Sequence, residues 1–160
     1  MGLKPNREAI GAAQTLNKMG KVRRKIKVHI KVKGDFPRLL PVGAFLTVAD
    51  NTGAKKLQII TVKNMKGRKR RSLAAAIADQ VICSVVEGNP EMKHQVVPAV
   101  IIRQRKEFRR PNGEHIKFYD NAAVVVTPEG ELKGTEIKGP VAKEAVQKWS
   151  ALAAAAKIVV

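Results

Sequence analysis

The residues that could bind a metal or act in catalysis are few, and they lie far apart along the chain. The three histidines, His29, His94 and His115, show no paired spacing, and Cys83 is the only cysteine. Because a structural zinc site takes about four Cys or His ligands, we expect no such site inside this chain. Cys83 lies in an apolar run, so we expect a buried, reduced core residue, as is usual in the cytosol.

Three aspartates, Asp50, Asp79 and Asp120, sit at the ends of predicted strands. An aspartate in that position is more often a turn residue, and catalysis would require the three to converge. The chain also lacks a Gly-x-Ser-x-Gly elbow and a phosphate-binding Gly-rich loop that ends in Lys-Ser/Thr. We therefore expect no enzymatic activity, no metal and no cofactor.

The chemistry that the sequence does favour is the binding of a polyanion. Thirty-one Lys and Arg against thirteen Asp and Glu give a net charge of +18. A compact body with that charge repels itself, and neutralised phosphates release counterions. The alternatives are a free basic protein and a membrane-surface binder. No apolar stretch approaches the roughly 20 residues that a membrane span needs, and we favour nucleic acid.

Two clusters of basic residues fall on predicted loops. Arginine suits them because its planar fork matches phosphate oxygens and is weakly hydrated. Either cluster alone could equally be a solvated loop or a localisation signal, but together they indicate RNA binding. The first comprises Lys66, Arg68, Lys69, Arg70 and Arg71, and the second Arg103, Arg105, Lys106, Arg109 and Arg110.

A basic N-terminal extension, residues 1–38, holds half of the net charge. Its eleven Lys and Arg against two acidic residues give 11 − 2 = +9. Apolar residues alternate with basic ones over residues 25–33, which predicts an exposed strand or extended arm. Residues 6–19 could form a short helix. The RNA-binding candidates of the arm are Arg23, Arg24, Lys25 and Lys27.

Residues 39–140 read as a β-rich domain. Strands are predicted at 43–50, 56–63, 80–87, 97–104 and 121–127, and a hairpin over 107–119 turns at Pro111-Asn112-Gly113. Many short strands without intervening helices indicate a barrel or a sandwich. Residues 141–160 form a C-terminal helical segment. Its helix, about 141–157, should begin at Gly139-Pro140 and dock an apolar stripe of Val141, Ala145, Trp149 and Leu152.

Aromatic residues bear on the kind of nucleic acid. They make up only 4% of the chain, which is little for a single-strand binder that stacks bases on aromatic platforms. Folded RNA is therefore the favoured ligand. Phe108 could stack on a base, but we favour a hairpin core residue. Two rivals remain: a free OB-like module that binds single strands, and a regulatory protein that acts through its C-terminal helix.

Ordered motifs over about residues 40–155 resemble the universal large-subunit ribosomal protein fourteen family. The run Ala99-Val100-Ile101-Ile102 is followed after nine residues by Asn112-Gly113, and then by Phe118, Asn121 and Val124-Val125. Segments 46–56, 98–106 and 134–144 agree with the same family. The stretch Gly88-Asn89-Pro90-Glu91 and the Trp149 region resemble its archaeal and eukaryotic branch.

The resemblance implies a small closed five-stranded OB-like barrel with a protruding β-hairpin and C-terminal helices. It implies a structural constituent of the large ribosomal subunit that binds rRNA near the factor-binding region and the sarcin–ricin loop. Small-subunit rRNA at an inter-subunit bridge, ribosomal proteins of the third and twenty-fourth types and an anti-association factor are the implied partners. The implied location is the cytosolic ribosome, with nucleolar assembly if the source is eukaryotic, and we expect no homo-oligomer.

Carried over to this chain, the resemblance assigns rRNA contacts to Lys55 and Lys56 and to both basic loops. It assigns a protein-facing and bridge-facing role to the C-terminal motif, that is to Gly139, Pro140, Val141, Lys143 and Glu144, together with Trp149. Pro140 and Val141 could equally serve only to start the helix. The family does not explain the arm, for which our hypothesis is that it threads into rRNA helices.

Overall fold

The computed structural model describes residues 36–65, 67 and 72–160. The predicted arm strand at 25–33 and the predicted helix at 6–19 lie outside this part, as does the whole of the first basic cluster.

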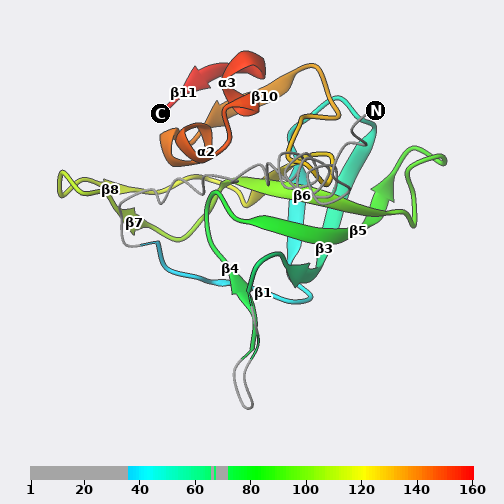
Figure 1. Ribbon diagram of the computed structural model, residues 1–160, viewed down its shortest axis with the longest axis horizontal. Helices are drawn as coiled ribbons and strands as arrows, with labels where there is room; N and C mark the ends of the chain where they lie inside the picture. Colours follow the sequence, from blue (N-terminus) through cyan, green and yellow to red (C-terminus); the bar gives the residue numbers. More distant parts are fainter. Residues whose placement is uncertain (1–35, 66, 68–71) are drawn as a thin grey trace, which may run out of the picture.

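A closed five-stranded barrel forms the body of the protein (Figure 1). Its strands are β2 (Phe45–Val48), β3 (Ala54–Val62), β5 (Gln80–Gly88), β6 (Val96–Arg103) and β9 (Ala122–Val125). They pair in that order and antiparallel, and β9 closes the barrel by pairing parallel with β2. All five predicted strands are present, and the barrel is confirmed over the sandwich.

Strand β9 and the Ala99–Ile102 part of β6 are apolar at every position and buried on both faces. One set of alternate residues joins the core inside the barrel, and the other set joins a second core under the C-terminal segment. The inner set includes Ala99, Ile101, Ala123 and Val125, and the outer set Val100, Ile102, Ala122 and Val124. The barrel wall thereby supplies the platform on which the C-terminal segment packs.

Two small sheets project from the barrel (Figure 1). Strand β1 (Leu40–Pro41) pairs with β4 (Ala74–Ala75), and β7 (Phe108–Arg109) pairs with β8 (His115–Ile116). The second pair is the predicted hairpin. Gly113 takes a φ of 90° in its turn, a conformation that glycine adopts without steric cost.

The C-terminal segment is not one helix, so the prediction of a helix over about 141–157 is wrong. With the strand that precedes it, the C-terminal segment covers residues 137–160 in the structure: β10 (Ile137–Val141), α2 (Lys143–Lys148), α3 (Ala151–Ala155) and β11 (Ala156–Val159). Pro140 lies inside β10 and does not begin a helix. Trp149 is extended, with φ −125° and ψ 93°, and separates the two helices.

Pairing of β10 with β11 explains this departure from the helical pattern. The two strands are parallel, with Val141 opposite Val159. Strand pairing satisfies backbone groups of the last residues and overrides the local helix preference of an alanine-rich stretch. The predicted apolar stripe does dock on the barrel: Val141, Ala145 and Leu152 are buried in the second core, and Trp149 packs against it.

Within residues 36–65, 67 and 72–160, no helix is long and apolar enough to cross a membrane. The same residues contain no group of three His, Cys, Asp or Glu side chains that could hold a metal ion.

Candidate RNA-binding surface

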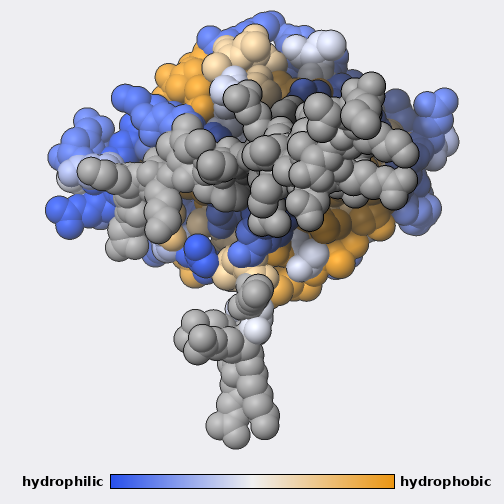
Figure 2. Space-filling view, in the orientation of Figure 1, coloured by the Kyte–Doolittle hydropathy of each residue, from blue (hydrophilic) through white to orange (hydrophobic). Residues whose placement is uncertain are grey.

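The second basic cluster divides into exposed and internally paired residues. Arg105, Lys106 and Arg109 are exposed. The backbone that carries them is fixed: the Arg105 N–H donates to Asn121 Oδ1 at 2.8 Å, and Gln104 Nε2 donates to the carbonyl of Lys106 at 3.3 Å. Figure 2 shows hydrophilic side chains gathered at the left, where Figure 1 places the β7–β8 hairpin. The three cations are therefore presented to solvent from an ordered backbone.

Arg103 is turned inward. Its Nε donates to Asp120 Oδ1 at 2.7 Å and its Nη2 to Asp120 Oδ2 at 3.0 Å, while Nη1 reaches the carbonyls of Lys138 and Pro140. The residue is 8% exposed. Its guanidinium therefore joins the barrel to β10.

The contact with Arg103 lowers the pKa of the Asp120 carboxyl below its usual value. Burial on its own would raise its pKa, but the hydrogen bonds and the charge of Arg103 outweigh burial and lower it. Thr47 Oγ1 also donates to this carboxylate, at 3.2 Å. The charge of Asp120 is consequently neutralised within the protein.

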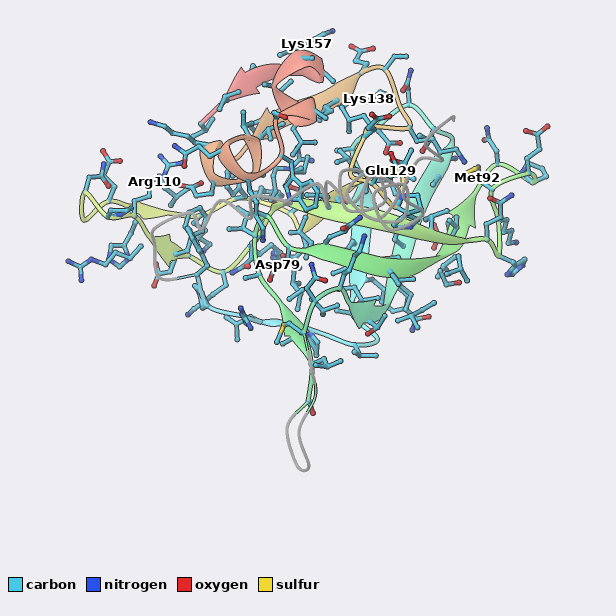
Figure 3. All side chains as sticks on the ribbon, in the orientation of Figure 1. Asp79, Met92, Arg110, Glu129, Lys138 and Lys157 are labelled. Carbon is cyan, nitrogen blue, oxygen red and sulfur yellow. The ribbon has the colours of Figure 1, made fainter. Side chains whose placement is uncertain are left out.

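Arg110 is also turned inward, next to the turn of the hairpin and beside α2 (Figure 3). Its Nε donates to Glu144 Oε1 at 2.6 Å, and its Nη2 donates to Glu144 Oε2 at 3.2 Å and to the carbonyl oxygen of Val160 at 2.7 Å. One side chain thus connects the hairpin, α2 and the residue that follows β11.

Phe108 is a core residue of the hairpin region, as favoured from the sequence. It is 2% exposed. Its ring centroid lies 5.5 Å from that of Phe36 and 6.4 Å from that of Phe118. These three rings hold the hairpin against the barrel.

Lys55 and Lys56 lie at the start of β3. Lys55 is exposed, whereas Lys56 is half-buried, pairs with Glu87 at 3.2 Å and lies 4.9 Å from the ring centroid of Phe45. Lys55 is therefore the better placed of the two to meet a phosphate. The predicted contacts of the first cluster (Lys66, Arg68, Lys69, Arg70, Arg71) and of the arm (Arg23, Arg24, Lys25, Lys27) lie outside the described residues.

The predicted C-terminal interface also divides by burial. Gly139 and Lys143 are exposed and Pro140 is half-buried, but Val141 and Glu144 are 0% and 4% exposed. Trp149 is half-buried and donates from Nε1 to the carbonyl of Ala78 at 2.8 Å. Val141, Glu144 and Trp149 therefore have structural partners inside the fold.

The sequence analysis missed two exposed features, one at the C-terminus and one beside the hairpin. The first is apolar: Ile158, Val159 and Val160 are 57%, 47% and 44% exposed, and their consecutive apolar types were a visible signal. The second is Tyr119, which is 97% exposed at the end of the hairpin. No local pattern distinguished it from Phe118, its buried neighbour.

Asp50 and Asp79, the other two aspartates considered at strand ends, have structural roles. Asp50 Oδ1 accepts from the Thr52 N–H at 2.9 Å, and Oδ2 accepts from the Val125 N–H at 2.6 Å. Asp79 closes a turn by accepting from the Ala76 N–H and pairs with Lys148 at 3.0 Å. Cys83 is buried, and burial raises the pKa of its thiol to about 12.

Comparison with known proteins agrees with this geometry. The family described as ribosomal protein L14p/L23e matches residues 39–160. The large ribosomal subunit protein uL14 of Methanococcus maripaludis is 57% identical over 122 residues, 76% of this chain and 92% of the relative. Its namesake in Thermoplasma acidophilum is 51% identical over 129 residues, 81% of this chain and 98% of the relative. The match of the family begins where the basic extension ends.

Proposed function

Because the chain belongs to the ribosomal protein L14p/L23e family, we propose that it binds large-subunit rRNA through exposed basic side chains on ordered loops. Membership makes it a structural protein of the large ribosomal subunit and not an enzyme, and its archaeal relatives agree with the predicted branch. The rRNA contacts of particular residues, the inter-subunit bridge and the docking of factors are proposed in addition to this structural role.

A single observation carries the rRNA-binding proposal. Arg105, Lys106 and Arg109 are exposed, and their segment is held by Gln104, Asn121 and the aromatic packing of Phe108. A cation whose backbone is already ordered loses less conformational entropy when it binds a phosphate. Arg103 and Arg110 are left out of the proposed contacts because their guanidinium groups bind carboxylates inside the protein.

The C-terminal segment is the proposed protein-facing and bridge-facing side. Exposed Lys143 and Gly139 lie on the same segment as the exposed apolar residues Ile158 and Val159. A cation beside apolar side chains suits a mixed surface of protein and rRNA. The proposed partners are small-subunit rRNA, ribosomal proteins of the third and twenty-fourth types and an anti-association factor. The proposed site of action is the cytosolic ribosome, with nucleolar assembly in a eukaryotic source.

Sucrose-gradient fractionation of the full chain tests the proposal. We expect co-migration with the large subunit that survives moderate salt. The variant Arg105→Ala/Lys106→Ala/Arg109→Ala should leave the subunit at lower salt. A wild-type pool that stays at the top of the gradient would contradict the proposal and favour a free single-strand binder.

The basic extension is a separate part of the proposal, supported by its charge of +9. Deleting residues 1–33 should lower the salt at which the protein leaves the particle, because phosphate contacts add to the salt dependence of binding. Unchanged release across the salt series would show that the extension makes no phosphate contact.

A further inference from the structure

Tyr119 is an aromatic side chain that the folded protein leaves in solvent. Its exposed fraction of 97% is the highest among the exposed large apolar side chains of the described residues. A tyrosine ring buries a large apolar area when it finds a partner, and among the residues that the structure describes this ring is 97% exposed. A single exposed apolar side chain is common on protein surfaces, so the order of its backbone and the charges around it decide what this ring can bind.

The backbone on both sides of Tyr119 is firmly held. Before it, Phe118 is 7% exposed, stacks on Phe108 and donates its N–H to the Gln104 carbonyl at 3.2 Å. After it, Asp120 is held by Arg103, and the carbonyl of Asn121 accepts from the Thr47 N–H at 2.9 Å. Tyr119 is thus presented outward from a fixed position, which reduces the entropy lost on binding.

The charges around Tyr119 suit an anionic ligand. Arg105 and Lys106 belong to a loop that is tied to this segment by the hydrogen bond from the Arg105 N–H to Asn121 Oδ1. Lys117, two residues before Tyr119, is exposed as well. The acidic neighbour Asp120 is paired with Arg103 and so repels a phosphate less.

We propose that Tyr119 stacks on an unpaired base of rRNA while Arg105 and Lys106 hold the flanking phosphates. The inference rests on the proposed rRNA binding and adds a base contact to it. Every base has an aromatic face, so stacking needs no particular nucleotide, but it needs one that has left its helix. A protein partner fits less well, because Lys is depleted at the core of protein–protein interfaces and both Lys106 and Lys117 are exposed on the segments around Tyr119.

Binding of an rRNA fragment to full-length variants tests the inference at one fixed salt concentration. Tyr119→Phe should bind within about 2-fold of wild type, whereas Tyr119→Leu and Tyr119→Ala should lose roughly 5- to 150-fold, the range measured for single stacked bases. The salt dependence should not change, because Tyr119 carries no charge. Since the side chain is exposed, thermal unfolding should be the same in all four proteins.

A second measurement reports on the ring itself. Tyr119 is the only tyrosine, so 3-fluorotyrosine labelling gives one fluorine resonance. We expect this resonance to shift on addition of the rRNA fragment, because a stacked base alters the local ring current.

The outcomes separate the two levels of the account. If wild type binds the fragment but Tyr119→Ala binds equally well and the resonance does not move, the stacking inference is overturned while rRNA binding stands. If wild type does not bind at all, rRNA binding itself fails. If Tyr119→Ala binds rRNA normally but enters particles poorly, the ring contacts a protein, which also overturns the inference.

Discussion

Arg110 and Glu144 form a bidentate ion pair that joins the hairpin to α2, with Nε–Oε1 at 2.6 Å and Nη2–Oε2 at 3.2 Å. Their side chains are 13% and 5% exposed. The two residues are 34 positions apart, so the contact closes a long loop between the parts of the protein that we assign to RNA and to protein partners.

Breaking this pair should destabilise the protein strongly. Arg110→Met leaves a buried carboxylate without its counter-charge, which we expect to cost about 3–5 kcal/mol in the free energy of unfolding. Urea denaturation measures this cost. The neighbouring Arg109→Met is the matched control, and it should change the free energy by less than about 0.5 kcal/mol because Arg109 is exposed.

The double variant Arg110→Met/Glu144→Leu should recover much of that loss. With both charges replaced by apolar side chains, no unpaired charge remains buried. The cost of the double variant should therefore be smaller than the sum of the two single costs. Additive costs would show that the two charges do not depend on one another.

Gly130→Ala should displace Trp149. A methyl group at Gly130 would clash with the indole ring, with Cε3 only 2.9 Å away, and the residue has a φ of +101°. Gly43→Ala is the control: Gly43 has a φ of +89° but nothing within 4 Å of the added carbon. The positive φ should cost each variant about 1–2 kcal/mol in the free energy of unfolding. Any further loss of stability in Gly130→Ala relative to Gly43→Ala then measures the clash with Trp149.

Fluorescence follows the same substitution directly. Trp149 is the only tryptophan, and its emission should move to longer wavelength in Gly130→Ala but not in Gly43→Ala. Identical spectra and equal losses of stability in the two variants would mean that a methyl group at Gly130 does not displace the indole ring of Trp149.

Cys83 should resist alkylation in the folded protein. Its pKa of about 12 against an ordinary 9.0 means that burial favours the neutral thiol. This contribution to stability is complete below pH 9 and is lost as the pH rises from 9 toward 12. Iodoacetamide at pH 8.5 should therefore modify Cys83 only when urea is present. Rapid modification without urea would show that the thiol is accessible in the native state.

The barrel was predictable from local pattern. Strand-forming residues bounded by turn residues located all five strands, and Asn112-Gly113 located the hairpin. The C-terminal segment was not predictable in this way, because alanine favours helix locally while the pairing of β10 with β11 depends on residues that lie almost twenty positions apart. Tertiary pairing decided the conformation there.

The binding surface was predictable only as a set of charges. Composition could not separate Arg105 and Arg109 from Arg103 and Arg110, since the carboxylates that bind the latter pair lie 17 and 34 residues away. Which aromatic side chains are buried also depends on residues that lie far away in the sequence. Phe108 is buried because Phe36 and Phe118 meet it in three dimensions, and Tyr119 is left outside that cluster.

The salt dependence of binding to large-subunit rRNA from the same organism shows whether the exposed cations of the second cluster contact phosphates. Wild type, Arg105→Ala/Lys106→Ala/Arg109→Ala and the control Lys93→Ala/Lys133→Ala/Lys157→Ala should be compared as full chains. Each lost phosphate contact removes about 0.7–0.9 from the slope of log K against log salt. We predict a slope shallower by roughly 2–3 for the first variant and little change for the control. Equal slopes in wild type and in the first variant would contradict rRNA binding through these exposed cations.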